Sequence, residues 1–140
     1  MSGTLHQATC VAIGGRGLLI EGRPGSGKSS LALALIDRGA VLVGDDGVTL
    51  ARDGDTLRVS PAPATAGLLE VRNVGVLEFP ILADVPVALV LRLDPAAPRF
   101  RDAPDWLDRL GVRLPAIDLW PASPILALRA EWALRRYGLR

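Results

Sequence analysis

Residues Gly22-Arg23-Pro24-Gly25-Ser26-Gly27-Lys28-Ser29 match the phosphate-binding loop pattern G-x-x-x-x-G-K-[ST] without a mismatch. Residues 17–21 in front of this loop are mostly apolar and indicate a buried strand, and residues 29–38 behind it have the apolar spacing of a helix. Such a unit points backbone N–H groups at phosphate oxygens, and the helix N-terminus adds partial positive charge. In this pattern Lys28 reaches the β- and γ-phosphates and Ser29 binds Mg²⁺. The stretch therefore predicts a site for a nucleoside triphosphate with Mg²⁺.

The composition is that of a small globular protein. The chain has 140 residues, of which 49% are hydrophobic and 22% are charged, and this predicts one domain, 1–140, with a real core. A formal charge of +1 gives no electrostatic argument for nucleic acid. Cys10 is the only cysteine, which excludes an internal disulfide, fits a reducing cytoplasm and suits a small core residue. No secretion signal or apolar run of about 18 residues is present, so we expect a soluble cytoplasmic protein with no membrane contact.

Strands are expected to outnumber helices in the middle of the chain. Residues 8–13 predict a strand that turns into the loop strand, and residues 40–43 predict a buried strand parallel to the first. Residues 48–59 alternate around a polar turn and indicate an antiparallel hairpin. Further strands are predicted at 68–71, 76–79 and 87–93.

The last third is expected to be less regular. Residues 94–114 are rich in Pro, Arg and Asp and predict a mobile connection with a short helical piece at 106–110. Ser123 and Pro124 are the expected cap and first residue of a final helix that ends near Gly138. Trp132 and Leu134 on that helix are expected in the core, with subunit contact or partner docking as the alternative. Its arginines suit a solvated helix end or an acidic partner.

Asp45 and Asp46 form a second candidate site after the strand that follows the loop helix. Phosphate-loop enzymes commonly place a carboxylate there for Mg²⁺ or its waters, and a second carboxylate can accept a proton. The alternative is an acidic turn that caps a strand. Glu70 and Arg72 alternate with apolar residues and share one face of a strand, either as an exposed ion pair or as part of the site. His6 alone carries no functional signal.

Taken as a set, these residues resemble a known family. The set runs in order through His6, the phosphate loop, Arg38-Gly39, Gly44-Asp45-Asp46 and Leu69-Glu70-Val71-Arg72-Asn73-Val74-Gly75-Val76. It is similar to the catalytic domain of HPr kinase/phosphorylase, which phosphorylates a serine of the phosphocarrier protein HPr using ATP. The resemblance covers nearly the whole chain. It implies an α/β phosphate-loop domain with a mixed sheet, like that of phosphoenolpyruvate carboxykinase.

The resemblance also implies a role for each matching residue. His6 would lie near the transferred phosphate, Lys28 would contact phosphate, and Ser29 and Glu70 would bind Mg²⁺. Asp46 would accept the proton of the substrate serine, with Asp45 beside it. Arg109, in Asp108-Arg109-Leu110-Gly111, matches a family element with a catalytic arginine, and Arg72 would act electrostatically.

Three departures from the family bear on activity and regulation. The family's N-terminal domain is absent from this sequence, which resembles a short form of the enzyme. The chain between Arg109 and Leu119 is shorter than the family pattern. Residues 121–125 replace a Pro-x-x-x-Gly-Arg-Asn stretch and lack its Arg and Asn, which argues against phosphorylase activity. Members of the family are often hexameric, so a homo-oligomer is expected.

Two other functions fit the same residues. A small-molecule kinase could use the same loop with a metabolite as acceptor. A nucleotide-sensing module could bind a partner in its ATP state without turnover.

Overall fold

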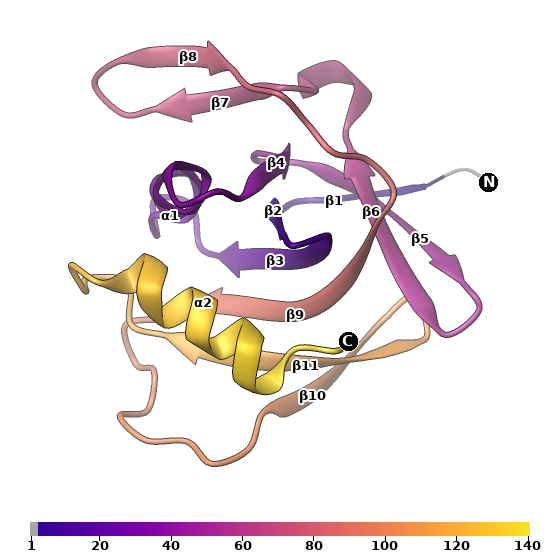
Figure 1. The fold of residues 1–140 in the computed structure, drawn as a ribbon, viewed down its shortest axis with the longest axis vertical. Coiled ribbons are helices and arrows are strands. Elements are labelled where there is room, and N and C mark those ends of the chain that lie inside the picture. Colours follow the sequence, from indigo (N-terminus) through magenta and orange to yellow (C-terminus); the bar gives the residue numbers. More distant parts are fainter. Residues whose placement is uncertain (1–2) are drawn as a thin grey trace.

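The computed structural model describes residues 3–140, which form a mixed nine-stranded sheet, a separate two-stranded sheet and two α-helices (Figure 1). The main sheet has the order β1-β5-β6-β9-β3-β2-β4, and β11 pairs with β9 and β10. Only the pairs β3–β9 and β9–β11 are parallel, and all other pairs of named strands are antiparallel. The elements are β1 (Thr4–His6), β2 (Thr9–Ile13), β3 (Arg16–Gly22), α1 (Lys28–Asp37), β4 (Val41–Gly44), β5 (Val48–Asp53), β6 (Thr56–Pro61), η1 (Pro63–Thr65), β7 (Leu68–Val71), β8 (Gly75–Glu78), β9 (Val85–Leu93), β10 (Asp105–Arg109), β11 (Val112–Leu119) and α2 (Leu126–Tyr137).

The central strands are buried on both faces because the sheet curls. In β3, Leu18 and Ile20 join the core beneath α1 and α2, whereas Leu19 joins a second core that includes residues of β5, β6 and β11. This alternation explains why β3 is a continuous apolar run rather than an amphipathic one. Helices α1 and α2 lie side by side in Figure 1, and Arg38 pairs with Glu131 between them. Neither helix is long and apolar enough to span a membrane.

The β7–β8 hairpin projects from one end of the domain (Figure 1). Leu69 of β7 is buried in the core under α1, whereas every residue of β8 is exposed. The hairpin closes where the Phe79 N–H donates to the Gly67 carbonyl at 2.8 Å. The hairpin therefore holds Glu70 beside the rest of the fold through buried Leu69, with partly buried Val71 and Phe79 packed against the same core.

The structure confirms the mixed α/β architecture and most predicted elements. The strand predicted at 40–43 is present as β4, but its prediction as parallel to the first strand is wrong, since β4 pairs antiparallel with β2. A tight glycine turn joins β2 to β3 antiparallel, and β4 adds to the free edge of β2. Cys10 lies in the core, and burial raises the pKa of its thiol.

Three predictions for the last third of the chain are wrong: the helical piece at 106–110, the start of the final helix, and the burial of Trp132. Of the connection expected at 94–114, residues 105–109 and 112–114 belong to strands β10 and β11. Residues 106–110 are not helical, because Asp105–Arg109 is the strand β10 of a hairpin with β11. Exposed Trp106 and Asp108 alternate with half-buried Leu107, which is a strand period, and Leu110 and Gly111 have φ of 55° and 82°, as a tight hairpin turn requires.

The final helix begins later than expected. α2 starts at Leu126, and the Ser123 hydroxyl instead accepts the Ile125 N–H at 3.1 Å in the preceding turn. Leu134 is buried as predicted. Trp132, however, is 62% exposed, so its assignment to the core is wrong.

Candidate active site

The phosphate loop joins the end of β3 to the start of α1, as its sequence predicts. Gly25 and Gly27 have φ of 80° and 103°, values that side chains disfavour and that the loop needs to turn its N–H groups inward. The Lys28 ammonium donates to the carbonyls of Gly22 at 2.8 Å and Arg23 at 3.2 Å. The Lys28 side chain is thus folded back onto the first two residues of the loop.

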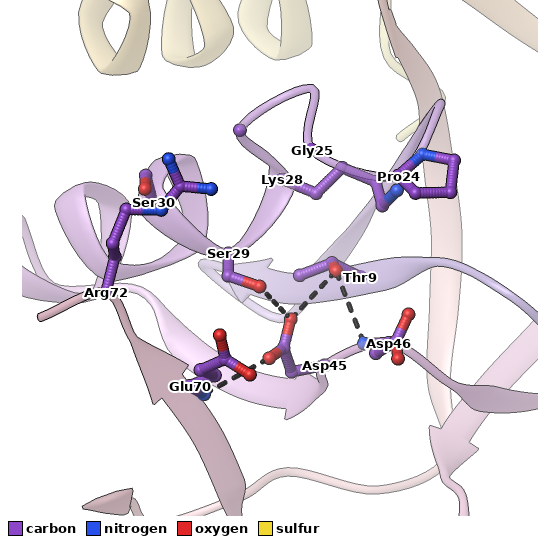
Figure 2. Close-up of a pocket in the computed structure, with 11 residues that line it drawn as sticks. Thr9, Pro24, Gly25, Lys28, Ser29, Ser30, Asp45, Asp46, Glu70 and Arg72 are labelled. Carbon is purple, nitrogen blue, oxygen red and sulfur yellow. Dashed lines mark hydrogen bonds between the residues drawn. The ribbon is translucent and has the colours of Figure 1, made fainter. Parts of the chain in front are cut away.

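Asp45 is a buried carboxylate behind the loop, only 7% exposed. One of its oxygens accepts the Ser29 hydroxyl at 2.7 Å and the Thr9 hydroxyl at 3.0 Å, and the other accepts the Glu70 N–H at 3.3 Å (Figure 2). These donors come from the start of α1, from β2 and from β7. A single buried carboxylate therefore ties the loop helix to the hairpin that carries Glu70.

Asp46 differs from Asp45 in exposure, in backbone conformation and in the hydrogen bonding of its carboxylate. It is exposed, its φ of 56° lies in the left-handed region, and its backbone N–H donates to Thr9 at 3.4 Å. Its carboxylate takes no hydrogen bond within residues 3–140 and faces a cavity of about 240 Å³ (Figure 2). A free carboxylate beside a phosphate loop can accept a proton. The same cavity is lined by Lys28, Ser29, Glu70 and Arg72, together with Thr9 and parts of the loop.

The oxygen donors of this cavity fit a hard divalent cation. The Ser29 hydroxyl is oriented by Asp45, and the Glu70 side chain lines the same cavity. Residues 3–140 contain no cluster of three or more His, Cys, Asp or Glu side chains that could hold a metal by themselves. Mg²⁺ commonly takes one or two protein oxygens with phosphate and water making up the rest, so Ser29 and Glu70 suit it in the presence of a nucleotide.

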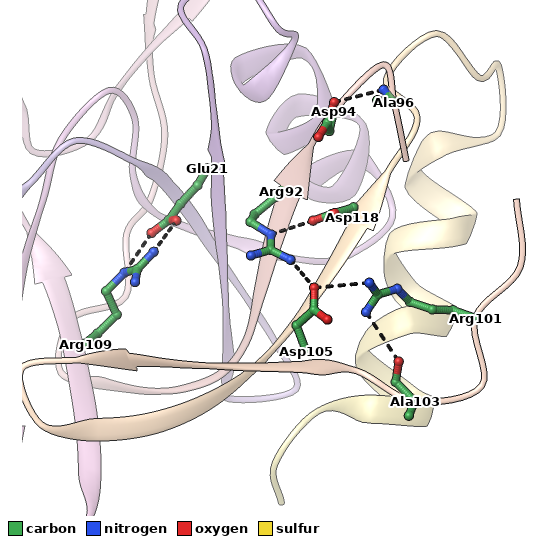
Figure 3. Close-up of polar contacts among 9 residues, drawn as sticks. All are labelled: Glu21, Arg92, Asp94, Ala96, Arg101, Ala103, Asp105, Arg109 and Asp118. Carbon is green, nitrogen blue, oxygen red and sulfur yellow. Dashed lines mark hydrogen bonds and ion pairs between the residues drawn. The ribbon is translucent and has the colours of Figure 1, made fainter. Parts of the chain in front are cut away.

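His6 and Arg109 are placed elsewhere. Neither lines the cavity with Asp46, and both contact Glu21, the residue directly before the phosphate loop. Arg109 donates to the two Glu21 oxygens at 2.7 and 3.4 Å, and the His6 Nε2 lies 2.7 Å from Glu21 Oε2. Figure 3 shows the Arg109 fork on Glu21. One half-buried carboxylate thus holds β1 and the β10–β11 hairpin against β3.

Thr9 and Glu21 are not among the site residues predicted from the sequence. Thr9 begins an apolar strand and Glu21 directly follows the apolar run Leu18–Ile20, and a polar residue at such a boundary is the signal that could have found each of them. Thr9 is fully buried and contacts Asp45 and Asp46. Glu21 contacts His6 and Arg109, the two residues for which the family resemblance implies a catalytic role. Their partners lie far away in the sequence, so their contacts were not readable from it.

Comparison with known proteins identifies the family of this chain. The family model described as HPr Serine kinase C-terminal domain matches residues 2–83, more than half of the chain. The chain belongs to this family. It is 34% identical to an HPr kinase/phosphorylase of Clostridium novyi over 97% of the chain, and 38% identical to one of Clostridium acetobutylicum over 72% of it. The chain spans only 49% and 34% of the length of these two relatives.

The fold matches a solved member of the family. The Hpr(Ser) kinase/phosphatase from Coxiella burnetii superposes with a TM-score of 0.81 and 28% identity, and the match covers 94% of each chain. The part of this HPr kinase homologue matched by the family model holds the phosphate loop, both aspartates, Glu70 and Arg72, whereas Arg109 lies beyond it. The cavity with Asp46 is therefore the part of the site that the family model spans.

Proposed function

We propose that this chain is an ATP-dependent protein-serine kinase that phosphorylates HPr. The proposal depends chiefly on one observation, the division of labour between two adjacent carboxylates. Asp45 is buried and uses both oxygens to hold Ser29, Thr9 and the Glu70 backbone, whereas Asp46 is free and faces the cavity. Membership of the HPr kinase family supports the choice of acceptor.

The reaction is in-line phosphoryl transfer. The acceptor serine oxygen forms a bond to the γ-phosphorus, the bond from that phosphorus to the β–γ bridging oxygen breaks, and ADP leaves. Asp46 takes the serine proton, and Lys28 together with the loop N–H groups stabilises charge on the transferring phosphoryl group. Ser29 and Glu70 would hold Mg²⁺, which would supply further charge neutralisation.

Other parts of the proposal come from the family resemblance. His6, Arg72 and Arg109 are proposed to act on the transferring phosphoryl group, although His6 and Arg109 would do so from the Glu21 side of the loop. The absence of the Arg and Asn of the dephosphorylation stretch favours kinase activity without phosphorylase activity. We also expect a homo-oligomer acting in the cytoplasm.

The test is incubation of the purified chain with Mg²⁺, ATP and HPr from the same cell, with intact-mass analysis of HPr. One added phosphoryl group on an HPr serine is the expected result, and it should persist through a chase with excess inorganic phosphate. Loss of the phosphoryl group in the chase would show phosphorylase activity. ATP binding without any mass gain would contradict HPr as the acceptor and favour a metabolite kinase or a nucleotide-sensing module.

A further inference from the structure

A second cavity, of about 760 Å³, lies against the phosphate loop, and neither Asp45 nor Asp46 lines it. It is lined by Glu21, Gly22, Arg23, Pro24, Gly25 and Ser26 of the loop side, by Arg92, Leu93, Asp94, Pro95 and Ala96 at the end of β9, and by Pro121 after β11. Pro24 and Gly25 also line the cavity with Asp46, so the two cavities meet at the loop. We propose that this second cavity binds the nucleoside of the triphosphate whose phosphates lie in the loop. This inference rests on the proposed nucleotide-dependent function.

The cavity lies where the fold favours a ligand. β3, β9 and β11 are the parallel strands of the sheet, and their carboxyl ends are aligned, with Gly22 opposite Leu93 and Leu93 opposite Leu119. Ligands of open α/β sheets bind outside the carboxyl ends of parallel strands. The second cavity lies at this row of strand ends, where the main-chain N–H of Asp94 donates to the Leu119 carbonyl at 3.0 Å and joins the ends of β9 and β11.

The chemistry of the two cavities decides which one takes the nucleoside. A nucleotide held by the loop can extend its nucleoside toward either of them. The first cavity contains Asp45, Asp46 and Glu70, which suit a cation and an acceptor hydroxyl. The second cavity presents the apolar side chains that cover a base, from Pro24, Leu93, Pro95, Ala96 and Pro121.

Two of the four charged residues that line the second cavity are held in ion pairs. Glu21 is paired with Arg109, and Arg92 is paired with Asp118 and Asp105 (Figure 3). The other two, Arg23 and Asp94, form no ion pair within residues 3–140. The paired side chains add little unpaired charge next to a neutral base.

Asp94 supplies one directional contact. One Asp94 oxygen accepts the Ala96 N–H at 2.8 Å, which fixes the turn after β9, and the other takes no hydrogen bond in residues 3–140 (Figure 3). That free oxygen can accept a bond from a ribose hydroxyl or from a base N–H. Recognition would thus combine apolar burial of the base with one acceptor.

The test compares MgATP with magnesium tripolyphosphate, which carries the phosphates without the nucleoside, by isothermal titration of the full chain. Ala96 and Ala97 provide a matched pair, because Ala96 lines the second cavity and Ala97 instead lines the neighbouring groove with Pro98 and Arg99. We expect the wild type to bind MgATP at least about tenfold more tightly than tripolyphosphate. Ala96→Trp should remove most of this difference without changing tripolyphosphate affinity, and Ala97→Trp should change neither.

Several results would overturn the inference. Equal affinity of the wild type for MgATP and tripolyphosphate would do so. An equal loss of affinity for both ligands in Ala96→Trp would also do so, as would a loss of MgATP affinity in Ala97→Trp as large as that in Ala96→Trp. Thermal unfolding checks that each variant is folded, and Ala96→Leu replaces the tryptophan variant if that one is not. Failure of the kinase proposal can be told apart from failure of this inference. If HPr gained no mass, the difference in affinity between MgATP and tripolyphosphate would still be measurable. Absence of binding by both ligands would overturn the nucleotide site and the nucleoside cavity together.

Discussion

The two sides of the phosphate loop carry similar residues arranged for opposite purposes. On one side, Asp46 and Glu70 face a cavity, and Asp46 has no hydrogen-bond partner for its carboxylate in residues 3–140. On the other side, the Glu21 carboxylate is only 15% exposed and is shared by His6 and Arg109. The first arrangement leaves an acceptor available for a proton, whereas the second uses the acceptor to position an arginine and a histidine side chain.

This difference shows that residue type and closeness to the loop do not define a role. Asp45, Asp46 and Glu21 all line cavities that include residues of the loop, yet of these three carboxylates only that of Asp46 has no hydrogen-bond partner within residues 3–140. A carboxylate that accepts several hydrogen bonds is committed to structure, because each donor left unpaired after its removal costs about 1–3 kcal/mol. A free carboxylate can change protonation without such a cost.

The largest effect is expected from removal of the free acceptor. Asp46→Asn should lower kcat for HPr phosphorylation by about 10²–10⁴-fold, the usual range for a positioned base, and should leave MgATP affinity within about twofold. Steady-state kinetics and calorimetry measure the two quantities. Asn also tolerates the left-handed conformation of this position, so the fold should persist.

Asp84 provides the matched control for Asp46→Asn. It is another exposed aspartate with a φ of 56°, and it lies outside both cavities at the loop. Asp84→Asn should retain wild-type kcat. Equal activity in the two variants would remove Asp46 from the role of base and break the contrast between the two sides.

Asp45→Asn should act on stability first. Asn keeps the shape of Asp45 but has one acceptor oxygen, so at least one of the groups on Ser29, Thr9 and Glu70 loses its partner. We expect the free energy of unfolding to fall by about 1–3 kcal/mol, measured by urea denaturation. Asp46→Asn should change it by less than about 0.5 kcal/mol, as exposed positions usually do. An unchanged midpoint for Asp45→Asn would show that the buried carboxylate is not needed to join α1 to the β7–β8 hairpin.

Much of this contrast could be predicted from the sequence, except for contacts between residues that are far apart in the chain. The loop, both aspartates and Glu70 were predicted because they occur in short segments with a local pattern, and the structure brings them into one cavity. The contacts of His6 and Arg109 with Glu21 could not be predicted in this way, because His6 lies 15 positions and Arg109 lies 88 positions from Glu21 in the sequence. The β10 strand was predicted as helix because the Pro-rich segment before it hid the alternation of Trp106, Leu107 and Asp108.

Glu21→Gln should have a smaller effect on activity than Asp46→Asn. Gln offers one acceptor oxygen for bonds that now use two, so Arg109 and His6 lose their fixed positions. Under the proposed kinase function, we expect kcat to fall by about 10–10²-fold with the KM for ATP little changed. His6 is the only histidine of the chain, so its imidazole NMR signals report the loss of the Glu21 contact without overlap. Unchanged signals or unchanged kcat would contradict a positioning role for Glu21.

The smallest effect is expected at Asp105, which ties the same β10–β11 hairpin to the sheet and so controls for general loosening. Hydrogen bonds from Arg101, and then from Arg92, lower the pKa of Asp105 below its ordinary value. A carboxylate whose pKa is lower in the folded state adds stability above its unfolded pKa, and that contribution is lost as the pH falls through the folded value. The melting temperature of the wild type should therefore slightly exceed that of Asp105→Asn at pH 7, and the difference should vanish well below about pH 4. If Asp105→Asn lowered kcat as much as Glu21→Gln, loosening of the hairpin would explain both, and Glu21 would lose its separate role beside the loop.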